Sequence, residues 1–182
     1  MPANKSRVSE ILSKIIIRPI NSSDSLEELT SLLHKSYKKL ADLGFKFLAT
    51  HQDVETTKQR LDNSECYVAI LNNKLIGTIC YRSPALKAKH EYYNQPFVAS
   101  YGQFAIDPAY QNVGLGGKLI DFVEKCAVRD NAKEIGIDTA EGAIDLIEFY
   151  KKRGYHFKAY AQWETTNYRS VIMTKTLKIL HL

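Results

Sequence analysis

Residues 111–117, with the sequence QNVGLGG, combine residue types that can bind a phosphate group. An apolar, strand-like run over residues 98–106 precedes them, and an amphipathic stretch over residues 118–129 follows them. A helix that begins directly after a glycine turn leaves its first backbone N–H groups without carbonyl partners, and the positive end of its dipole lies at the same point. Glycine lets the backbone approach an anion closely and adopt a positive φ. The segment is therefore predicted to bind a phosphate or pyrophosphate at the start of a helix.

The glycine spacing excludes two common phosphate-binding loops. The phosphate loop of nucleotide hydrolases has four residues between its first glycine and a Gly-Lys-Ser/Thr ending, which is not the spacing here. The dinucleotide-binding pattern has a third glycine at the helix-packing position, and this segment lacks it. A glycine-rich helix start that binds nothing is the alternative, so the prediction depends on the surrounding sequence.

Residues 102–120 resemble the acetyl-CoA-binding motif of the GNAT superfamily of N-acyltransferases. That motif is Q/R-x-x-G-x-G/A after a strand that ends in a hydrophobic-x-Pro sequence; Gln111, Gly114 and Gly116 fill its defined positions, and Pro108 takes the place of its proline. Residues 148–155, EFYKKRGY, are similar to the family's aromatic-Tyr-x-x-x-Gly-aromatic segment. The two segments lie in the family's order and separation, so the C-terminal half carries most of the resemblance.

The resemblance implies acetyl-CoA as the cosubstrate, with no metal. In the family, the strand before the glycine turn and the strand before the last helix splay apart, and the pantetheine arm lies between them. The strand residues would pair with pantetheine, and the turn residues would wrap the pyrophosphate through backbone N–H groups. The residues expected to bind the cosubstrate are Phe104, Ala105, Ile106, Gln111, Asn112, Val113, Gly114, Leu115, Gly116, Gly117 and Lys118.

Tyr150 takes the position at which the family has a general acid near the CoA sulfur. Acyl transfer to an amine needs a neutral amine, a polarised carbonyl and a proton for the leaving thiolate. A phenol with a pKa near ~10 stays protonated at neutral pH and can supply that proton. Otherwise, Tyr150 is an aromatic residue on a packed helix face.

Two departures from the family pattern concern the site. Many members have a glutamate base on the strand before the glycine turn, where this chain has Tyr101 and Gln103 and no carboxylate. Ala143 stands seven residues before Tyr150, where the family frequently has an asparagine that contacts pantetheine. The remaining candidates for a general base are Asp138, Glu141, His90 and Glu91.

The pattern of apolar residues and turns predicts one α/β domain over residues 15–182, after a loose tail over residues 1–14. The expected strands are residues 15–20, 66–71, 74–81, 98–106, 134–139, 157–163 and 171–177, and the expected helices are residues 26–43, 53–61, 118–129 and 143–153. Asn72-Asn73 is expected to form a tight hairpin, and Gly154 is expected to end the last helix at a positive φ. The order βααβββαβαββ agrees with a GNAT-like mixed sheet of about six or seven strands flanked by about four helices.

Composition limits the remaining possibilities. A chain of 182 residues is typical of a single domain, and its apolar runs are too short to span a bilayer. Cys66, Cys80 and Cys126 are widely spaced and odd in number, which favours reduced, buried thiols in a cytoplasmic protein over a disulfide framework or a metal site. The net charge of +5 suits an anionic ligand, but the basic residues are scattered, so we expect no nucleic-acid partner and no membrane partner.

These observations predict an N-acetyltransferase that moves the acetyl group of acetyl-CoA directly to a primary amine of a small molecule or peptide. The transfer would occur in a ternary complex on a monomer or homodimer. The alternative is a non-catalytic acyl-CoA-binding or regulatory module, which the missing strand carboxylate and Ala143 favour. A nucleic-acid-associated protein is supported by the basic charge alone. The acceptor is expected to contact residues 26–61 and 83–97, whose candidates are Tyr37, Phe45, Phe47, His51, Asp53, Glu55, Tyr92 and Tyr93.

Overall fold

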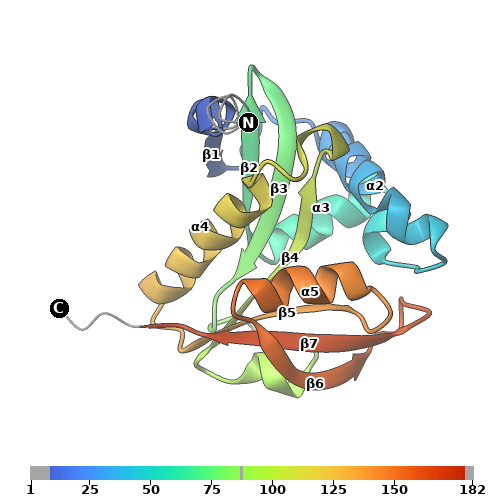
Figure 1. Cartoon of the computed structure of the whole chain (residues 1–182), viewed down its shortest axis with the longest axis vertical. Helices are drawn as coiled ribbons and strands as arrows, with labels where there is room; N and C mark the ends of the chain where they lie inside the picture. Colours follow the sequence, from blue (N-terminus) through green and yellow to red (C-terminus); the bar gives the residue numbers. More distant parts are fainter. Residues whose placement is uncertain (1–8, 87, 179–182) are drawn as a thin grey trace, which may run out of the picture.

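A seven-stranded mixed sheet forms the centre of the computed structural model, which describes residues 9–86 and 88–178 (Figure 1). The strands are β1 (Ile16–Pro19), β2 (Glu65–Leu71), β3 (Lys74–Arg82), β4 (Val98–Ile106), β5 (Glu134–Ala140), β6 (His156–Gln162) and β7 (Arg169–Thr176). Their order across the sheet is β1-β2-β3-β4-β5-β7-β6. The neighbours β4 and β5 are parallel, and the other neighbouring pairs are antiparallel.

Helices cover both faces of this sheet. They are α2 (Leu26–Asp42), α3 (Val54–Asp62), α4 (Leu115–Arg129) and α5 (Ile144–Lys152), with short 3-10 turns η1 (Leu48–Thr50), η2 (Glu91–Asn94) and η3 (Pro108–Tyr110). In Figure 1, α4 and α5 lie in front of the sheet, whereas α3 passes behind β4. The expected order βααβββαβαββ and the GNAT-like α/β fold are confirmed.

The two central strands diverge soon after they meet. In the described residues, β4 pairs with β5 at Val98, Ala99 and Ser100 and no further, although both strands continue beyond that point. We call the unpaired stretch beyond Ser100 and Gly136 the β4–β5 gap. The backbone groups of β4 and β5 that face the gap have no partner strand on that side. A ligand with amide groups can therefore pair with them. The splayed pair expected from the resemblance is therefore present.

The main core lies between the sheet and the helices α4 and α5. Leu119, Ile120 and Val123 lie on one face of α4 and are fully buried, as their spacing in the sequence predicts. They pack in one cluster with β-strand side chains such as Ile79 and Ile135. This packing fixes the start of α4 against the end of β4.

Two predicted turns have the expected conformation. Asn72 and Asn73 have φ values of 49° and 60°, as a tight hairpin between β2 and β3 requires. Gly154 has a φ of 87° directly after α5, so the left-handed end of that helix is confirmed.

Residues 9–14 are helical, which corrects the expectation of a loose tail for this part of the chain. Residues 1–8 lie outside the described residues. Ile11 and Leu12 pack against the main core, and Lys118 Nζ donates a hydrogen bond of 2.8 Å to the Leu12 carbonyl. That contact joins residues 106 positions apart, so local sequence patterns do not reveal it.

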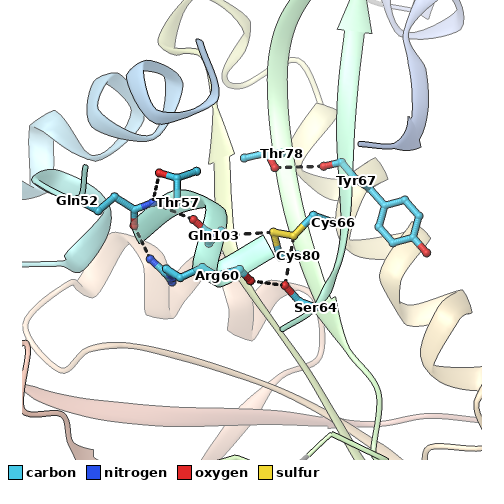
Figure 2. Close-up of a disulfide and its surroundings, with 9 residues drawn as sticks. All are labelled: Gln52, Thr57, Arg60, Ser64, Cys66, Tyr67, Thr78, Cys80 and Gln103. Atoms are coloured by element: carbon cyan, nitrogen blue, oxygen red, sulfur yellow. Dashed lines mark hydrogen bonds between the residues drawn. A yellow bond between two sulfur atoms is a disulfide. The ribbon is translucent and has the colours of Figure 1, made fainter. Parts of the chain in front are cut away.

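Cys66 and Cys80 form a disulfide between β2 and β3, with 4.0 Å between their Cα atoms (Figure 2). The expectation of three reduced thiols is therefore wrong for these two residues. They lie directly opposite each other in the antiparallel register, which spacing along the chain does not show. Cys126 is a free, buried thiol, as expected.

Candidate active site

The start of α4 offers unpaired backbone donors. Gly114 precedes the helix at a φ of 91°, and the first helical hydrogen bond runs from the Lys118 N–H to the Gly114 carbonyl at 3.1 Å. The N–H groups of residues 115–117 therefore have no acceptor within the helix. In this part of the described chain, no side chain caps the helix, and its first turn holds no acidic residue. The expected phosphate seat is thus free of a competing anion.

Glycine at position 116 lets β4, α4 and α5 come close together. A Cβ atom there would lie 3.2 Å from the Phe104 ring, which is tighter than ordinary packing. The Phe104 ring in turn stacks on Phe149 of α5, with 6.5 Å between the ring centroids. Gly116 therefore positions the end of β4 against the helix start.

Arg153 adds a positive charge at this place. It directly follows α5, and its Nη1 would lie 2.8 Å from a Cβ atom at Gly117. Its guanidinium also bonds to Asp121 of α4. Because the contact forms between two helices, the glycine motif alone gave no sign of it.

The main chain at the end of β4 faces the gap. Asp107 N–H donates to the Ile76 carbonyl of β3 at 2.9 Å, so the strand alternation turns the main-chain groups of Ile106 and Phe104 away from β3. The hydroxyl of Tyr37 in α2 donates to the Phe104 carbonyl at 3.1 Å. The N–H groups of Phe104 and Ile106 therefore point toward the gap, as the expected pairing with pantetheine requires.

The Ile106 carbonyl has two donors of its own. It accepts hydrogen bonds from Ser36 Oγ at 2.8 Å and from Gln111 Nε2 at 3.2 Å. Gln111 of the glycine motif thus ties the turn to the strand. Ser36 and Tyr37 of α2, which hold this strand end, were not assigned this role from the sequence.

Tyr150 lies on α5, is 4% exposed and packs in the main core cluster. Burial raises the pKa of its phenol well above the ordinary value, and the nearby Tyr101, Tyr37 and Asp138 raise it further. Tyr101 lies on β4 and Asp138 on β5, each just beyond the last paired residue of its strand, so the phenol interacts electrostatically with groups on both sides of the gap. Among the described residues, no hydrogen bond to its hydroxyl contributes to this shift of the pKa. A protonated donor is thereby available to a ligand in the gap.

Asp138 is the candidate base that the structure brings to the gap. Trp163 Nε1 donates to its carboxylate at 2.8 Å, and the Tyr93 hydroxyl donates at 3.4 Å. Desolvation raises the pKa of this carboxyl, and the two hydrogen bonds only partly offset the rise. A raised pKa makes a carboxylate a better proton acceptor near neutral pH.

The other candidate bases have different surroundings. Glu141 forms an ion pair of 2.7 Å with Arg169, and Glu91 is exposed. His90 packs its ring against Trp163 at 5.9 Å, and its Nδ1 accepts a hydrogen bond from the Tyr92 N–H. His90 therefore packs beside the Trp163 ring that donates to Asp138, whereas the charge of Glu141 is already paired with Arg169.

An aromatic cluster lies beside the end of β4, where the Tyr37 hydroxyl bonds to the Phe104 carbonyl. Tyr37, Phe45, Phe47 and Tyr168 contact one another, with centroid distances from 4.7 to 6.4 Å. Three of the four were acceptor candidates in the sequence; Tyr168, from the β6–β7 loop, was not. Loops so distant in the chain share no local pattern that would have identified it.

Asn167 fastens the β6–β7 loop to the segment after α2. Its side chain accepts a hydrogen bond from the Lys46 N–H at 2.8 Å and donates one to the Gly44 carbonyl at 2.9 Å. The first of these bonds joins residues 121 positions apart. The sequence did not indicate this anchor either.

The remaining acceptor candidates have structural surroundings. Asp53 caps α3 by accepting from the Thr56 N–H at 2.7 Å, and His51 and Glu55 are exposed. Tyr92 bonds to Glu134 at 2.8 Å, beneath β5 and β7. Ala143 directly precedes α5 and is buried, so no amide side chain approaches the gap at that position.

Comparisons with known proteins show the family of this chain. Residues 26–155 match the Acetyltransferase (GNAT) family. S-(2-succino)cysteine N-acetyltransferase from Bacillus subtilis (strain 168) is 31% identical over 131 residues, which cover 71% of this chain and 77% of the relative. S-alkylcysteine N-acetyltransferase from the same organism is 27% identical over 157 residues, or 85% of each chain.

Solved structures share the fold. A GNAT family acetyltransferase from Elizabethkingia anophelis with acetyl-CoA bound has a TM-score of 0.65 at 20% identity, covering 90% of this chain and 99% of that one. The ribosomal-protein-S18-alanine N-acetyltransferase from Escherichia coli has a TM-score of 0.67 at 13% identity, with coverage of 92% and 96%. Within the described residues, no cluster of His, Cys, Asp and Glu could hold a metal ion, and no helix could cross a membrane.

Proposed function

Because the chain belongs to the acetyltransferase (GNAT) family, we propose that it transfers the acetyl group of acetyl-CoA to the α-amine of an S-substituted cysteine. The observation that carries the proposal is the class of acceptor that the names of both relatives share. Each name specifies cysteine whose sulfur carries a substituent, and each relative matches over most of its length. The substituent is a 2-succino group in the first name and an alkyl group in the second.

Acetyl-CoA would lie along the end of β4 and over the start of α4. Its pyrophosphate would accept hydrogen bonds from the N–H groups of residues 115–117, with Arg153 and Lys118 supplying positive charge nearby. Its pantetheine amides would pair with the main chain at Phe104 and Ile106. The acetyl-CoA bound to the similar Elizabethkingia structure supports this cosubstrate.

The transfer would use one proton acceptor and one proton donor. The acceptor's neutral amine attacks the thioester carbonyl carbon, and the new N–C bond forms as the C–S bond breaks. The nitrogen releases a proton to the Asp138 carboxylate, directly or through a water molecule, and the departing sulfur takes the Tyr150 proton. The raised pKa values of both groups suit these roles, since the phenol arrives protonated and the carboxylate is basic.

A non-catalytic acyl-CoA-binding module is the second candidate. The observations in its favour are the absence of a carboxylate on β4 and the alanine that precedes α5 at position 143. Such a module would bind acetyl-CoA and release no thiol with any amine. Turnover therefore separates the two candidates.

The test is a panel of amines with CoA thiol release and product mass as readouts. The panel contains S-ethylcysteine, S-(2-succino)cysteine, unsubstituted amino acids, spermidine and a short peptide with a free N-terminus. We expect S-substituted cysteines to give the highest kcat/KM and a product heavier by one acetyl group. Acetyl-CoA binding without release of thiol from any of these amines would favour the non-catalytic module instead. A higher kcat/KM for the peptide would contradict the acceptor class.

A further inference from the structure

Among the arginines that the structure describes, two lack the partner that the others have. Arg18, Arg129, Arg153 and Arg169 each form an ion pair with a carboxylate. Among the described residues, Arg60 and Arg82 have no such partner, and both are half-buried. Guanidinium groups taken partly out of water without a counter-charge are costly, so an anion at this place would stabilise them.

Arg60 is held in place by a neutral network. It lies in the last turn of α3, and its Nη1 donates to Gln52 Oε1 at 2.6 Å. The amide nitrogen of the buried Gln52 donates to Thr57 at 2.7 Å and to Gln103 at 3.0 Å, as Figure 2 shows. This network orients the guanidinium without neutralising it, and the other N–H donors of Arg60 stay available.

Gln103 connects this network to β4, the strand proposed to bind the cosubstrate. It has a φ of 43° at the bulge of β4, where the register with β3 shifts between Thr78 and Cys80. The bulge turns its side chain toward Gln52 and the disulfide. The position of Arg60 is therefore set by the same strand that would hold the cosubstrate.

Arg82 lies within electrostatic range of Arg60. It ends β3 opposite Ser100 of β4, at the point where β4 and β5 begin to diverge. By strand alternation it shares a sheet face with Cys80, whose sulfur accepts from Gln103. The charge of Arg82 acts on Arg60, lowering the pKa of that guanidinium beyond the effect of burial. An anion bound between the two positive charges would relieve this repulsion.

Arg60 also interacts electrostatically with groups of the candidate reaction centre. Tyr37, Asp138 and Tyr168 all act electrostatically on Arg60. Asp138 is the proton acceptor proposed above, and Tyr37 and Tyr168 belong to the aromatic cluster. In an α-amino acid, the carboxylate is two bonds from the amine nitrogen. An amine that approaches Asp138 would therefore bring its carboxylate into the neighbourhood of the arginines.

We propose that Arg60 and Arg82 bind the α-carboxylate of the acceptor, so that the enzyme selects free amino acids over amines without that group. This proposal rests on the proposed function and names its specificity-determining residues. A planar guanidinium pairs with a carboxylate through two parallel hydrogen bonds, which fixes the direction of the adjacent amine. The S-substituent would then extend toward the aromatic cluster.

The test compares two acceptors that differ by the carboxylate alone. S-ethylcysteine and 2-(ethylthio)ethylamine share the amine and the thioether. We expect the parent protein to acetylate the amino acid with a kcat/KM about a hundredfold higher, since buried polar groups left unpaired penalise the second acceptor. Arg60→Gln and Arg82→Gln should each raise the KM for S-ethylcysteine about tenfold and change the KM for 2-(ethylthio)ethylamine far less, because that amine has no carboxylate to lose.

Controls separate this effect from misfolding and from loss of the cosubstrate. Arg129→Gln removes an arginine that already has carboxylate partners, and it should leave both acceptors unaffected. Each variant should keep the parent's melting temperature shift with acetyl-CoA. Arg60→Lys, which keeps the charge and loses the planar fork, should fall between the parent and Arg60→Gln.

The outcomes distinguish this proposal from the proposed function. Equal kcat/KM values for the two acceptors in the parent protein would overturn the carboxylate site and leave the acetyltransferase reaction standing. If neither acceptor turns over, the proposed function fails. Calorimetric titration of S-ethylcysteine into the CoA-loaded protein then tests whether the two arginines bind the carboxylate. Binding that Arg60→Gln and Arg82→Gln weaken would support them, whereas absent or unchanged binding would refute them.

Discussion

The two sides of the β4–β5 gap are built in different ways. The side proposed for acetyl-CoA comes from one continuous segment, in which β4, η3 and the start of α4 follow one another. The side proposed for the acceptor combines α2, α3, β5 and the β6–β7 loop, and one of its anchoring bonds joins residues 121 positions apart. A continuous segment carries a motif that can be recognised in a sequence, whereas a composite surface does not. The cosubstrate was therefore predictable and the acceptor was not.

The largest effect is expected on the acetyl-CoA side, from Gly114→Asp. The carboxylate would occupy the helix start and repel the pyrophosphate, and the residue would be strained at a φ of 91°. We expect the Kd for acetyl-CoA to rise roughly a thousandfold, or about 4 kcal/mol, in a calorimetric titration.

A matched variant lies on the acceptor side. Gly44 also has a positive φ, 87°, and follows α2. Gly44→Asp introduces the same charge and comparable backbone strain, yet it should leave the Kd for acetyl-CoA near the parent value. Equal losses of affinity in the two variants would show that the comparison between the two sides is wrong.

Tyr150→Phe tests the point where the two sides meet. Removal of the hydroxyl should lower kcat about a hundredfold, because the thiolate loses its proton donor, and acetyl-CoA affinity should stay unchanged. Steady-state thiol release measures the first quantity, and calorimetry measures the second. Tyr155→Phe is the control, since that hydroxyl bonds to Glu124 at 3.0 Å, and its kcat should match the parent. Parent-like turnover in Tyr150→Phe would remove Tyr150 from the mechanism.

Asp138→Asn should lower kcat/KM about tenfold at neutral pH and abolish the acid limb of the pH profile. Activity of the parent should fall as pH falls through the raised pKa of Asp138, because the carboxylate then takes up a proton. A variant that keeps this acid limb would assign the base to another group.

Asp138→Asn should also change how the melting temperature depends on pH. Above the pKa of Asp138 the substitution should lower activity but favour the folded state. A carboxyl whose pKa is raised in the folded state favours folding while protonated, and that contribution is lost as pH rises through the folded-state pKa. Asparagine cannot ionise. Hence the melting temperature of Asp138→Asn relative to the parent should be higher above that pKa than at pH 4. A relative melting temperature that is lower above this pKa than at pH 4 would contradict the buried-base assignment.

Gly154→Val should have the smallest effect on chemistry. The β-branched side chain is strained at a φ of 87°, so the free energy of unfolding should fall by about 1–2 kcal/mol. Denaturant unfolding measures this loss, and Gly154→Asn should lose less because asparagine tolerates the left-handed region. The kcat of folded Gly154→Val should equal that of the parent. A large fall in kcat would show that the end of α5 also positions Tyr150.

Elements with a local pattern were predicted closely from the sequence. The bounds of β4 agree with the prediction, and α4 begins at Leu115, three residues before the predicted start, because the glycines themselves enter the helix. The Cys66–Cys80 disulfide was missed, since it depends on the register of two strands. The proximity of Arg60 and Arg82 likewise requires α3 to be docked on the sheet. Register and docking are tertiary properties that periodicity does not contain.

The short seam between β4 and β5 has a mechanical consequence. Three residue pairs join a four-stranded half of the sheet, β1–β4, to a three-stranded half, β5–β7. A pantetheine arm paired with β4 would fill the gap and stiffen the junction between the two halves. Its release would leave the edge of β4 without a hydrogen-bonding partner. Amide hydrogens of Phe104 and Ile106 would then exchange with deuterium quickly between turnovers and slowly during them. The rigidity of the protein would rise and fall with each catalytic cycle.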